Sequence, residues 1–233
     1  MFNNKGSGDD RMRIQAVIFD MDGVIFDTER LALKVWMRTA EELGIPDIEL
    51  LYPSCIGTNY ARTQEILYDR YGSSFPQKEF TDRVRKYYKE AAYGGLPVKP
   101  GAEELLSQLK VQHTPTALAS STASEIVRQE LEDADLIGYF DALICGDMVR
   151  HSKPDPEIFL KAGEAVNVEP SGCLVIEDSF NGIRAAAAAG MHPLMVPDLL
   201  QPTEEIRELA EWIFPDLREV RRFLEMKNTA SGN

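Results

Sequence analysis

Short apolar runs alternate with stretches of helical periodicity along most of the chain, and this alternation narrows the folds open to it. The runs are almost continuously apolar, as strands are when helices cover both faces of a sheet. The predicted strands are Ile14–Phe19, Pro115–Ala119, Ala142–Ile144, Cys173–Ile176, Pro193–Val196 and the weaker Trp212–Phe214. The predicted helices between them are Ala102–Leu109, Ala123–Glu132, Pro156–Val166 and Asn181–Ala189. Such an order predicts βαβ units, and therefore an α/β protein with a doubly wound parallel sheet.

One segment interrupts this order, because residues 29–96 contain three helical stretches and no convincing strand. These stretches are Leu31–Leu43, Asn59–Tyr71 and Gln77–Ala92. An insertion directly after the first strand overhangs the carboxyl ends of the strands, where open α/β sheets bind ligands. We therefore expect an α/β core of residues 14–28 and 97–226, an all-helical cap of residues 29–96, a flexible leader of residues 1–13 and a flexible tail of residues 227–233.

Charge and composition exclude several classes of partner. The 233 residues carry a formal charge of −13, which disfavours nucleic acid as a partner. No apolar stretch is long enough to span a bilayer, and the polar leader lacks the apolar core of a secretory signal. The three cysteines are widely spaced and form no zinc pattern, so a reducing, cytoplasmic setting is expected. The sequence makes no prediction of oligomeric state.

Polar side chains gather where the predicted strands end. They are Asp20 and Asp22 after the first strand, Ser120 and Ser121 after the second, Lys153 beyond the third, and Glu177 and Asp178 after the fourth. Four carboxylates cannot converge in ionised form without compensation, and a hard cation such as Mg²⁺ with oxygen ligands supplies it. The hydroxyls and the lysine suit the oxygens of a phosphoryl group. No His or Cys dominates the cluster, which disfavours a Ser-His or Cys-His nucleophile.

The nucleophile expected at this edge is a carboxylate. Asp20 and Asp22 are two residues apart in an extended segment, so their side chains point to the same side of that segment. One of them can attack phosphorus while the other, if protonated, donates to the leaving oxygen. The pattern therefore predicts a phosphate-monoester hydrolase that acts on a small phosphorylated metabolite.

Four motifs in order give the chain a family resemblance. They are Phe19–Glu29, Ala119–Ser121, Lys153–Phe159 and Val175–Ala186. The chain resembles the haloacid-dehalogenase-type (HAD) hydrolase superfamily, in the branch of β-phosphoglucomutase-like phosphatases with a helical cap. The resemblance extends from about Ile14 to Leu224 and implies a Rossmann-like core.

The resemblance also implies roles for the residues. Asp20 becomes a transient aspartyl phosphate, and Asp22 is the general acid and then the general base. Ser120 and Lys153 bind the transferring phosphoryl group, with Ser121 as a further candidate, although a serine here also suits a helix N-cap. Mg²⁺ is held by the Asp20 carboxylate, the Asp22 main-chain carbonyl, the Asp178 carboxylate and, directly or through water, Glu177. Phosphorylated sugars are the first expected substrates.

Two other functions stay open at this stage. A β-phosphoglucomutase of this branch carries a histidine after the first motif and an arginine a few residues after a cap glycine. The corresponding positions here are Ala32 and Tyr60, with Arg62 two residues later. A protein that binds a phosphometabolite without turnover is the third possibility, but pure binding does not need an acid two residues from a nucleophile.

Overall fold

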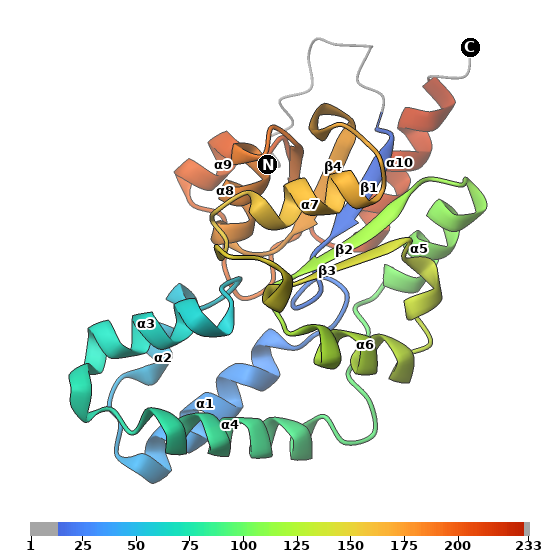
Figure 1. The fold of residues 1–233 in the computed structure, drawn as a ribbon. Coiled ribbons are helices and arrows are strands. Elements are labelled where there is room, and N and C mark those ends of the chain that lie inside the picture. Colours follow the sequence, from blue (N-terminus) through green and yellow to red (C-terminus); the bar gives the residue numbers. More distant parts are fainter. Residues whose placement is uncertain (1–13, 231–233) are drawn as a thin grey trace.

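A wholly parallel six-stranded sheet forms the centre of the computed structural model, which describes residues 14–230, with side chains through residue 227 (Figure 1). The strands are β1 (Ala16–Phe19), β2 (Thr116–Ser120), β3 (Ala142–Cys145), β4 (Cys173–Glu177), β5 (His192–Met195) and β6 (Trp212–Ile213). Their order in the sheet is β3-β2-β1-β4-β5-β6. The chain therefore builds outward from β1 in both directions, and the switch point lies between β1 and β4, where such sheets bind ligands. The expected α/β, doubly wound fold is confirmed.

Helices cover both faces of this sheet. One face packs against α5 (Ala102–Val111), α6 (Ser124–Asp133) and α10 (Leu217–Ala230), and the other packs against α7 (Glu157–Ala165) and α8 (Phe180–Ala188). Side chains of β1 alternate between the two layers: Val17 and Phe19 enter the first, Ala16 and Ile18 the second. This double burial explains why the strand is apolar at every position.

The bounds of several strands and helices in the core differ from those predicted from the sequence. β1 begins at Ala16 rather than Ile14, and most other strands shift by one residue. A short helix, α9 (Glu204–Leu209), packs beside α8, although it was not predicted. The last helix continues to Ala230, so the tail expected from residue 227 begins inside α10. The predicted leader lies outside the described residues. In the described part of the chain, no helix has both the length and the apolar character needed to cross a membrane.

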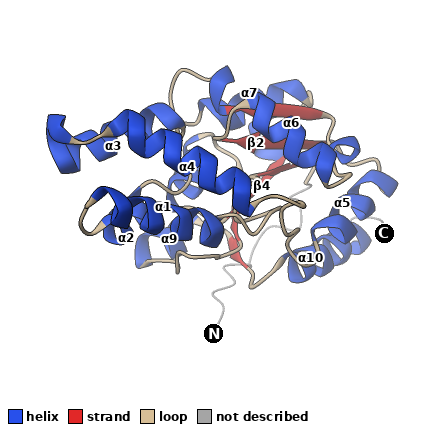
Figure 2. Cartoon of the chain, turned by 90° about the horizontal axis from the view of Figure 1, so that it is seen from below, coloured by secondary structure: helices blue, strands red, loops and turns tan. Residues whose placement is uncertain are grey.

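The segment between β1 and α5 forms a separate helical layer (Figures 1 and 2). It contains α1 (Glu29–Leu43), α2 (Ile48–Leu51), α3 (Tyr60–Tyr71) and α4 (Gln77–Ala91), with single 3₁₀ turns at Tyr52–Ser54 and Gly72–Ser74. These helices have their own small core around Ala40, Ile48, Leu67 and Phe80. We call residues 29–96 the cap.

Two linkers join the cap to the core, and they run side by side. Asp27 donates its main-chain N–H to the carbonyl of Pro97 at 2.9 Å, and Lys99 donates to the carbonyl of Ile25 at 2.8 Å. The cap is thus tied to the core at adjacent points of the chain, next to the end of β1.

Candidate active site

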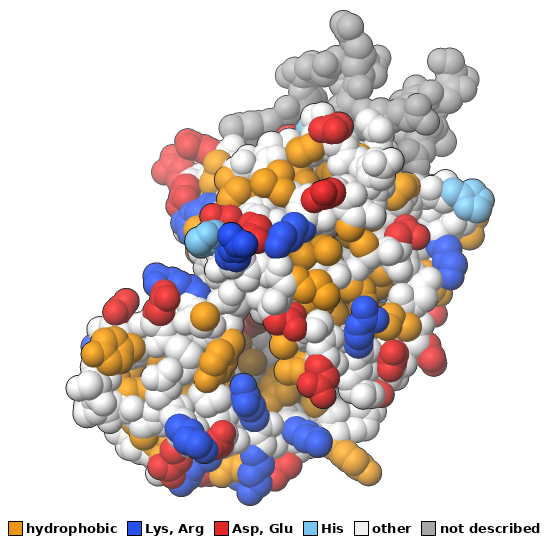
Figure 3. Space-filling view, viewed as in Figure 1, with side chains coloured by type: hydrophobic (Ala, Val, Ile, Leu, Met, Phe, Trp, Pro, Cys, Tyr) orange, Lys and Arg blue, Asp and Glu red, His pale blue; other side chains and the backbone are white. Residues whose placement is uncertain are grey.

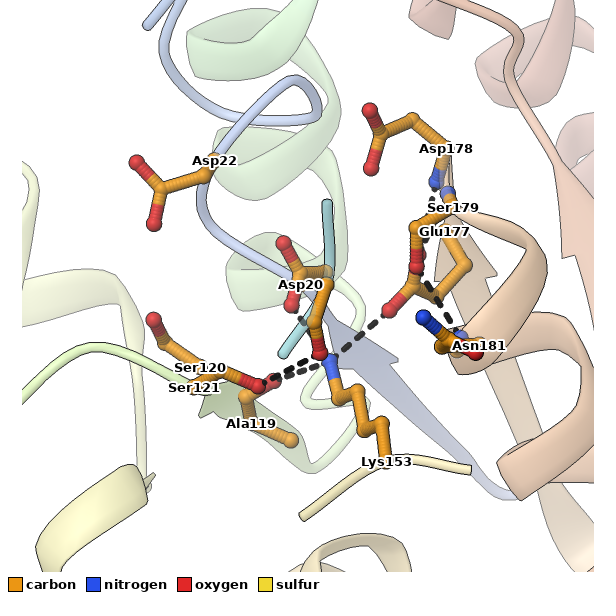
Figure 4. Close-up of polar contacts among 12 residues, drawn as sticks. Asp20, Asp22, Ala119, Ser120, Ser121, Lys153, Glu177, Asp178, Ser179 and Asn181 are labelled. Carbon is orange, nitrogen blue, oxygen red and sulfur yellow. Dashed lines mark hydrogen bonds and ion pairs between the residues drawn. The ribbon is translucent and has the colours of Figure 1, made fainter. Parts of the chain in front are cut away.

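Asp20 follows directly after β1 and is the most central of the predicted residues (Figure 4). It is only 5% exposed, and its main-chain N–H donates to the carbonyl of Ile176 on β4 at 3.0 Å. The sheet ladder therefore continues up to this residue and fixes its position. Burial raises the pKa of Asp20 to about 8, and the nearby Glu177 and Asp22 add to this, while Lys153 acts in the opposite direction.

Lys153 joins two of the carboxylates. Its Nζ is fully buried and donates to Asp20 Oδ1 at 2.5 Å, to Glu177 Oε1 at 2.7 Å and to the carbonyl of Ala119 at 3.0 Å. All three donors of the ammonium group thus have acceptors, as a buried lysine requires. Burial opposes the charge on Lys153, but Asp20 and Glu177 outweigh it and hold its pKa above the usual value. Lys153 binds only Oδ1 of Asp20 and makes no hydrogen bond to Oδ2, the other carboxyl oxygen.

Glu177 is the last residue of β4, and its side chain accepts hydrogen bonds from the loop that follows. Its Oε2 accepts from the N–H of Asp178 at 2.9 Å, from the N–H of Ser179 at 2.8 Å and from the hydroxyl of Ser179 at 2.9 Å. The same hydroxyl accepts from the N–H of Gly182 and caps α8. With Oε1 on Lys153, both oxygens of Glu177 are engaged, so the structure gives this predicted metal ligand a visible role in positioning Lys153 and the Asp178 loop.

Asp22 lies away from the lysine and is held by hydroxyl groups. Thr28 donates to Oδ1 at 2.7 Å, and Thr122 donates to Oδ2 at 3.0 Å. Burial raises the pKa of Asp22, and these two hydrogen bonds only partly oppose that effect. A carboxyl group of this kind retains a proton more readily than an exposed aspartate, which suits a general acid.

Asp178 is the site's unsatisfied carboxyl group. It is 2% exposed, and its Oδ2 is buried without a hydrogen-bond partner. Burial raises its pKa, with further contributions from Glu177 and Glu29. Gly23, at φ 76°, leaves it space, because a Cβ there would lie 2.2 Å from Asp178 Oδ2. A buried carboxyl oxygen without a hydrogen-bond partner is suited to bind a cation.

The carboxylate oxygens at this edge of the sheet are of the type that binds a magnesium ion, but their side chains do not converge on one point. Within residues 14–230, no three His, Cys, Asp or Glu side chains converge closely enough to hold a metal as they stand. In Figure 4 the carboxyl groups of Asp22 and Asp178 lie on either side of Asp20. The free oxygens of Asp20 and Asp178 are hard ligands of the type that Mg²⁺ prefers. A divalent ion between them would also offset their mutual repulsion.

The two predicted serines lie in different surroundings. Ser120, at the end of β2, is fully buried, and its hydroxyl accepts from the N–H of Thr122 at 3.1 Å. Ser121 lines the cleft, and its hydroxyl donates to the carbonyl of Gly57 in the cap at 2.9 Å. The structure thus shows Ser120 shaping the turn after β2 and Ser121 contacting the cap, while their binding of phosphate stays a prediction.

A cleft of about 1380 Å³ separates the cap from these groups. The hollow is visible between the two parts of the molecule in Figure 3. Asp20, Asp22 and Asp178 line it from the core, and α1 and α4 line it from the cap. Two buried cap residues in its wall, Glu29 and Tyr52, were not assigned from the sequence. The only sequence signal for them is the position of Glu29 at the end of the first motif.

These features place the protein among the α/β proteins in which a helical cap covers acidic residues at the carboxyl edge of a parallel sheet. Residues 17–196 match the family described as haloacid dehalogenase-like hydrolase, and the chain belongs to this family. The expected membership of its β-phosphoglucomutase-like branch is confirmed by the relatives that follow.

Three relatives show the range of this branch. The phosphorylated carbohydrates phosphatase of Thermotoga maritima is 38% identical over 178 residues, which cover 76% of this chain and 82% of that protein. Hexitol phosphatase B of Escherichia coli is 31% identical over 188 residues, covering 79% and 84%. The crystal structure of β-phosphoglucomutase from Clostridium difficile superimposes with a TM-score of 0.78 at 26% identity, covering 93% of this chain and 97% of that one.

Proposed function

We propose that this protein is a magnesium-dependent phosphatase that hydrolyses phosphate monoesters of small metabolites, phosphorylated sugars first, through a phosphorylated Asp20. The observation that carries the proposal is the state of Asp20: it is buried at the end of β1, Lys153 binds one carboxyl oxygen, and the other faces the cleft beside Asp22. The names of the phosphatases among its relatives support the same reaction.

The proposed first step transfers the phosphoryl group to the protein. The free oxygen of Asp20 attacks phosphorus, the bond between phosphorus and the leaving oxygen breaks, and Asp22 gives its proton to that oxygen. The raised pKa of Asp22 keeps this proton available. Lys153 stabilises the charge that builds up on the phosphoryl oxygens, because it is fixed and cannot turn away.

The second step returns Asp20 to its starting state. A water molecule loses a proton to the Asp22 carboxylate and attacks phosphorus, and the bond to the Asp20 oxygen breaks with release of inorganic phosphate. Thr28 and Thr122 hold Asp22 in place for both steps. Mg²⁺, bound by the Asp20 and Asp178 carboxylates and the Asp22 carbonyl, with Glu177 nearby, would neutralise charge on the carboxylates and the phosphoryl group.

The test replaces the nucleophile. Asp20→Asn retains size and loses the anion, so turnover of p-nitrophenyl phosphate with Mg²⁺ should fall by several orders of magnitude while the melting temperature shows a folded protein. Asp69→Asn, at an exposed cap position, is the matched control and should retain activity. Near-normal turnover in Asp20→Asn would refute the aspartyl-phosphate mechanism. Activity that persists in EDTA would refute the need for metal.

Phosphatase activity is favoured over mutase activity by the cap. Ala32 lines the cleft where the mutases have a histidine. Arg62 is half-exposed, pairs with Glu65 at 2.8 Å and is not among the residues that line the cleft. Without the histidine and the arginine that mutases of this branch carry, water intercepts the phosphorylated aspartate. Phosphorus NMR should therefore show release of phosphate from β-glucose 1-phosphate, and rapid isomerisation to glucose 6-phosphate without release would identify a mutase.

A further inference from the structure

Glu29 is a buried carboxyl group in the cap that the proposed reaction does not use. It is the first residue of α1, it is 7% exposed, and it lines the cleft with Asp22. Its Oε2 accepts from the hydroxyl of Tyr52 at 2.7 Å. Its Oε1 has no hydrogen-bond or ion-pair partner among the described residues.

The surroundings of Glu29 are costly for a carboxyl group. No lysine or arginine in the described part of the chain forms an ion pair with it, and the charged groups that act on it are acidic: Asp22, Asp20 and Asp198. Burial and these neighbours raise the pKa of Glu29 to about 8. Glu29 Oε1 is not one of the fully buried side-chain atoms without a partner, so this oxygen reaches the cleft and can bond to a molecule there.

A favourable interaction with the helix dipole does not explain this burial. Acidic residues also occupy the first turns of α4 and α5, at Glu79, Glu103 and Glu104, and there the side chains are exposed. An exposed carboxylate at a helix N-terminus is also stabilised by the dipole, so this interaction does not require burial. Glu29 is instead turned inward, toward the space that a substrate would occupy.

The position of the Glu29 carboxyl group is fixed by an aromatic chain in the cap. The Tyr52 ring packs edge-on against Trp36, with centroids 5.1 Å apart, and Trp36 packs edge-on against Phe80 at 5.3 Å. Phe80 belongs to the small core of the cap. The Tyr52 hydroxyl therefore reaches Glu29 from a packed, rigid side chain, as a preorganised binding group requires.

We propose that Glu29, held by Tyr52, binds a hydroxyl group of the leaving group and so makes the enzyme prefer polyhydroxylated phosphate monoesters to simple alkyl ones. This inference rests on the proposed phosphatase function. Next to Glu29 the partner that fits is a hydroxyl, because it both donates and accepts, whereas an anionic group at this point would meet repulsion from Glu29 and Asp22. Arg85 and Lys89 also line the cleft, so this repulsion applies to the position beside Glu29 and not to the whole leaving group. A site built to bond a hydroxyl strongly rejects an analogue that lacks it.

The experiment compares wild type with Glu29→Leu, Glu29→Gln and the control Glu41→Gln, which lies at an exposed position of the same helix. The substrates are propyl phosphate, p-nitrophenyl phosphate and a panel of hexose, pentose and hexitol monophosphates. Wild type should have a higher kcat/KM for the best panel member than for propyl phosphate. Glu29→Leu should reduce this ratio at least tenfold, Glu29→Gln should restore it to within about threefold, since an amide also bonds a hydroxyl, and Glu41→Gln should not change it.

Three results would overturn the inference. They are a wild type with no preference over propyl phosphate, a ratio unchanged in Glu29→Leu, and a tenfold rise in the Mg²⁺ concentration for half-maximal activity in Glu29→Gln, which would assign Glu29 to the metal. Turnover of p-nitrophenyl phosphate by the wild type separates these results from failure of the phosphatase proposal. Tyr52→Phe should lower the ratio in the same direction as Glu29→Leu, because it frees the carboxyl group.

Discussion

Replacing Glu177 with glutamine tests how the site is held together. The four hydrogen bonds at this carboxylate all arrive from donors: Lys153 at Oε1, and the Asp178 N–H, the Ser179 N–H and the Ser179 hydroxyl at Oε2. Glutamine offers only one acceptor oxygen, and its NH₂ group must then face either the ammonium of Lys153 or two main-chain N–H groups. In both orientations a buried donor loses its acceptor.

The cost follows from the burial of these groups. Lys153 is 1% exposed and Glu177 is fully buried, so neither can be rescued by water. Breaking a buried ion pair by removal of one partner typically destabilises a protein by about 3–5 kcal/mol. For a chain of this size about 1 kcal/mol corresponds to about 2–4 °C in Tm. Glu177→Gln should therefore lower Tm by about 6 °C or more, and it should also reduce turnover, because Lys153 loses one of its two carboxylate anchors.

Thermal unfolding followed by circular dichroism measures this loss. Glu164→Gln is the matched control, since it makes the same chemical change at an exposed position of α7 and should alter stability by less than about 0.5 kcal/mol. A Tm for Glu177→Gln within about 2 °C of wild type would show that the Lys153–Glu177 pair does not support the fold.

Two further predictions concern buried carboxyl groups. Gly182→Ala should lower Tm markedly, because its Cβ would lie 1.8 Å from Glu177 Oε1, whereas the control Gly138→Ala has no atom within 4 Å of its Cβ and should be tolerated in the same melting experiment. In EDTA, Glu29→Gln should raise Tm relative to wild type at pH 9 but not at pH 4. Burial raises the pKa of Glu29 in the folded protein from 4.5 to about 8. The folding stability that Glu29 allows below pH 4.5 is therefore lost as pH rises through 8, at about 1.4 kcal/mol for each unit of pKa shift. Equal melting shifts at both pH values would contradict this.

The sheet was predictable because its strands are buried on both faces. Val17 and Ile18 point into opposite layers, so neither position tolerates a polar residue and the run is continuously apolar. The short helix α9 gave no such signal, since only Ile206 of its six residues is buried. Strand ends shifted by a residue or two because the hydrogen bonds that end a strand depend on its neighbours rather than on its own residues.

Some parts of the site were likewise predictable from the sequence, and others were not. Asp20, Lys153 and Asp178 were predictable as neighbours, because the carboxyl ends of parallel strands meet at one edge. The environment of Glu29 was not, since it depends on Tyr52, which comes from a 3₁₀ turn 23 residues further along the chain. The bonds that occupy Oε2 of Glu177 were equally hidden, because they arise only when the loop after β4 folds back on it.

Besides the linkers and the ion pair between Arg30 and Asp198 at 3.4 Å, the cap contacts the core through the segment Ile56–Asn59, and these contacts link the position of the cap to the loops of the site. The carbonyl of Gly57 accepts from Ser121, the N–H of Asn59 donates to Ser152 at 2.8 Å, and the carbonyl of Ile56 accepts from Asn181 at 3.1 Å. These three core partners lie close in sequence to predicted site residues: Ser121 follows Ser120, Ser152 precedes Lys153, and Asn181, in α8, comes three residues after Asp178. Gly57 itself has no room for a side chain, because a Cβ would lie 2.3 Å from Ser179 Oγ. Opening of the cap would break all three bonds, and it would therefore release the loops around Asp20 from their contacts with the cap.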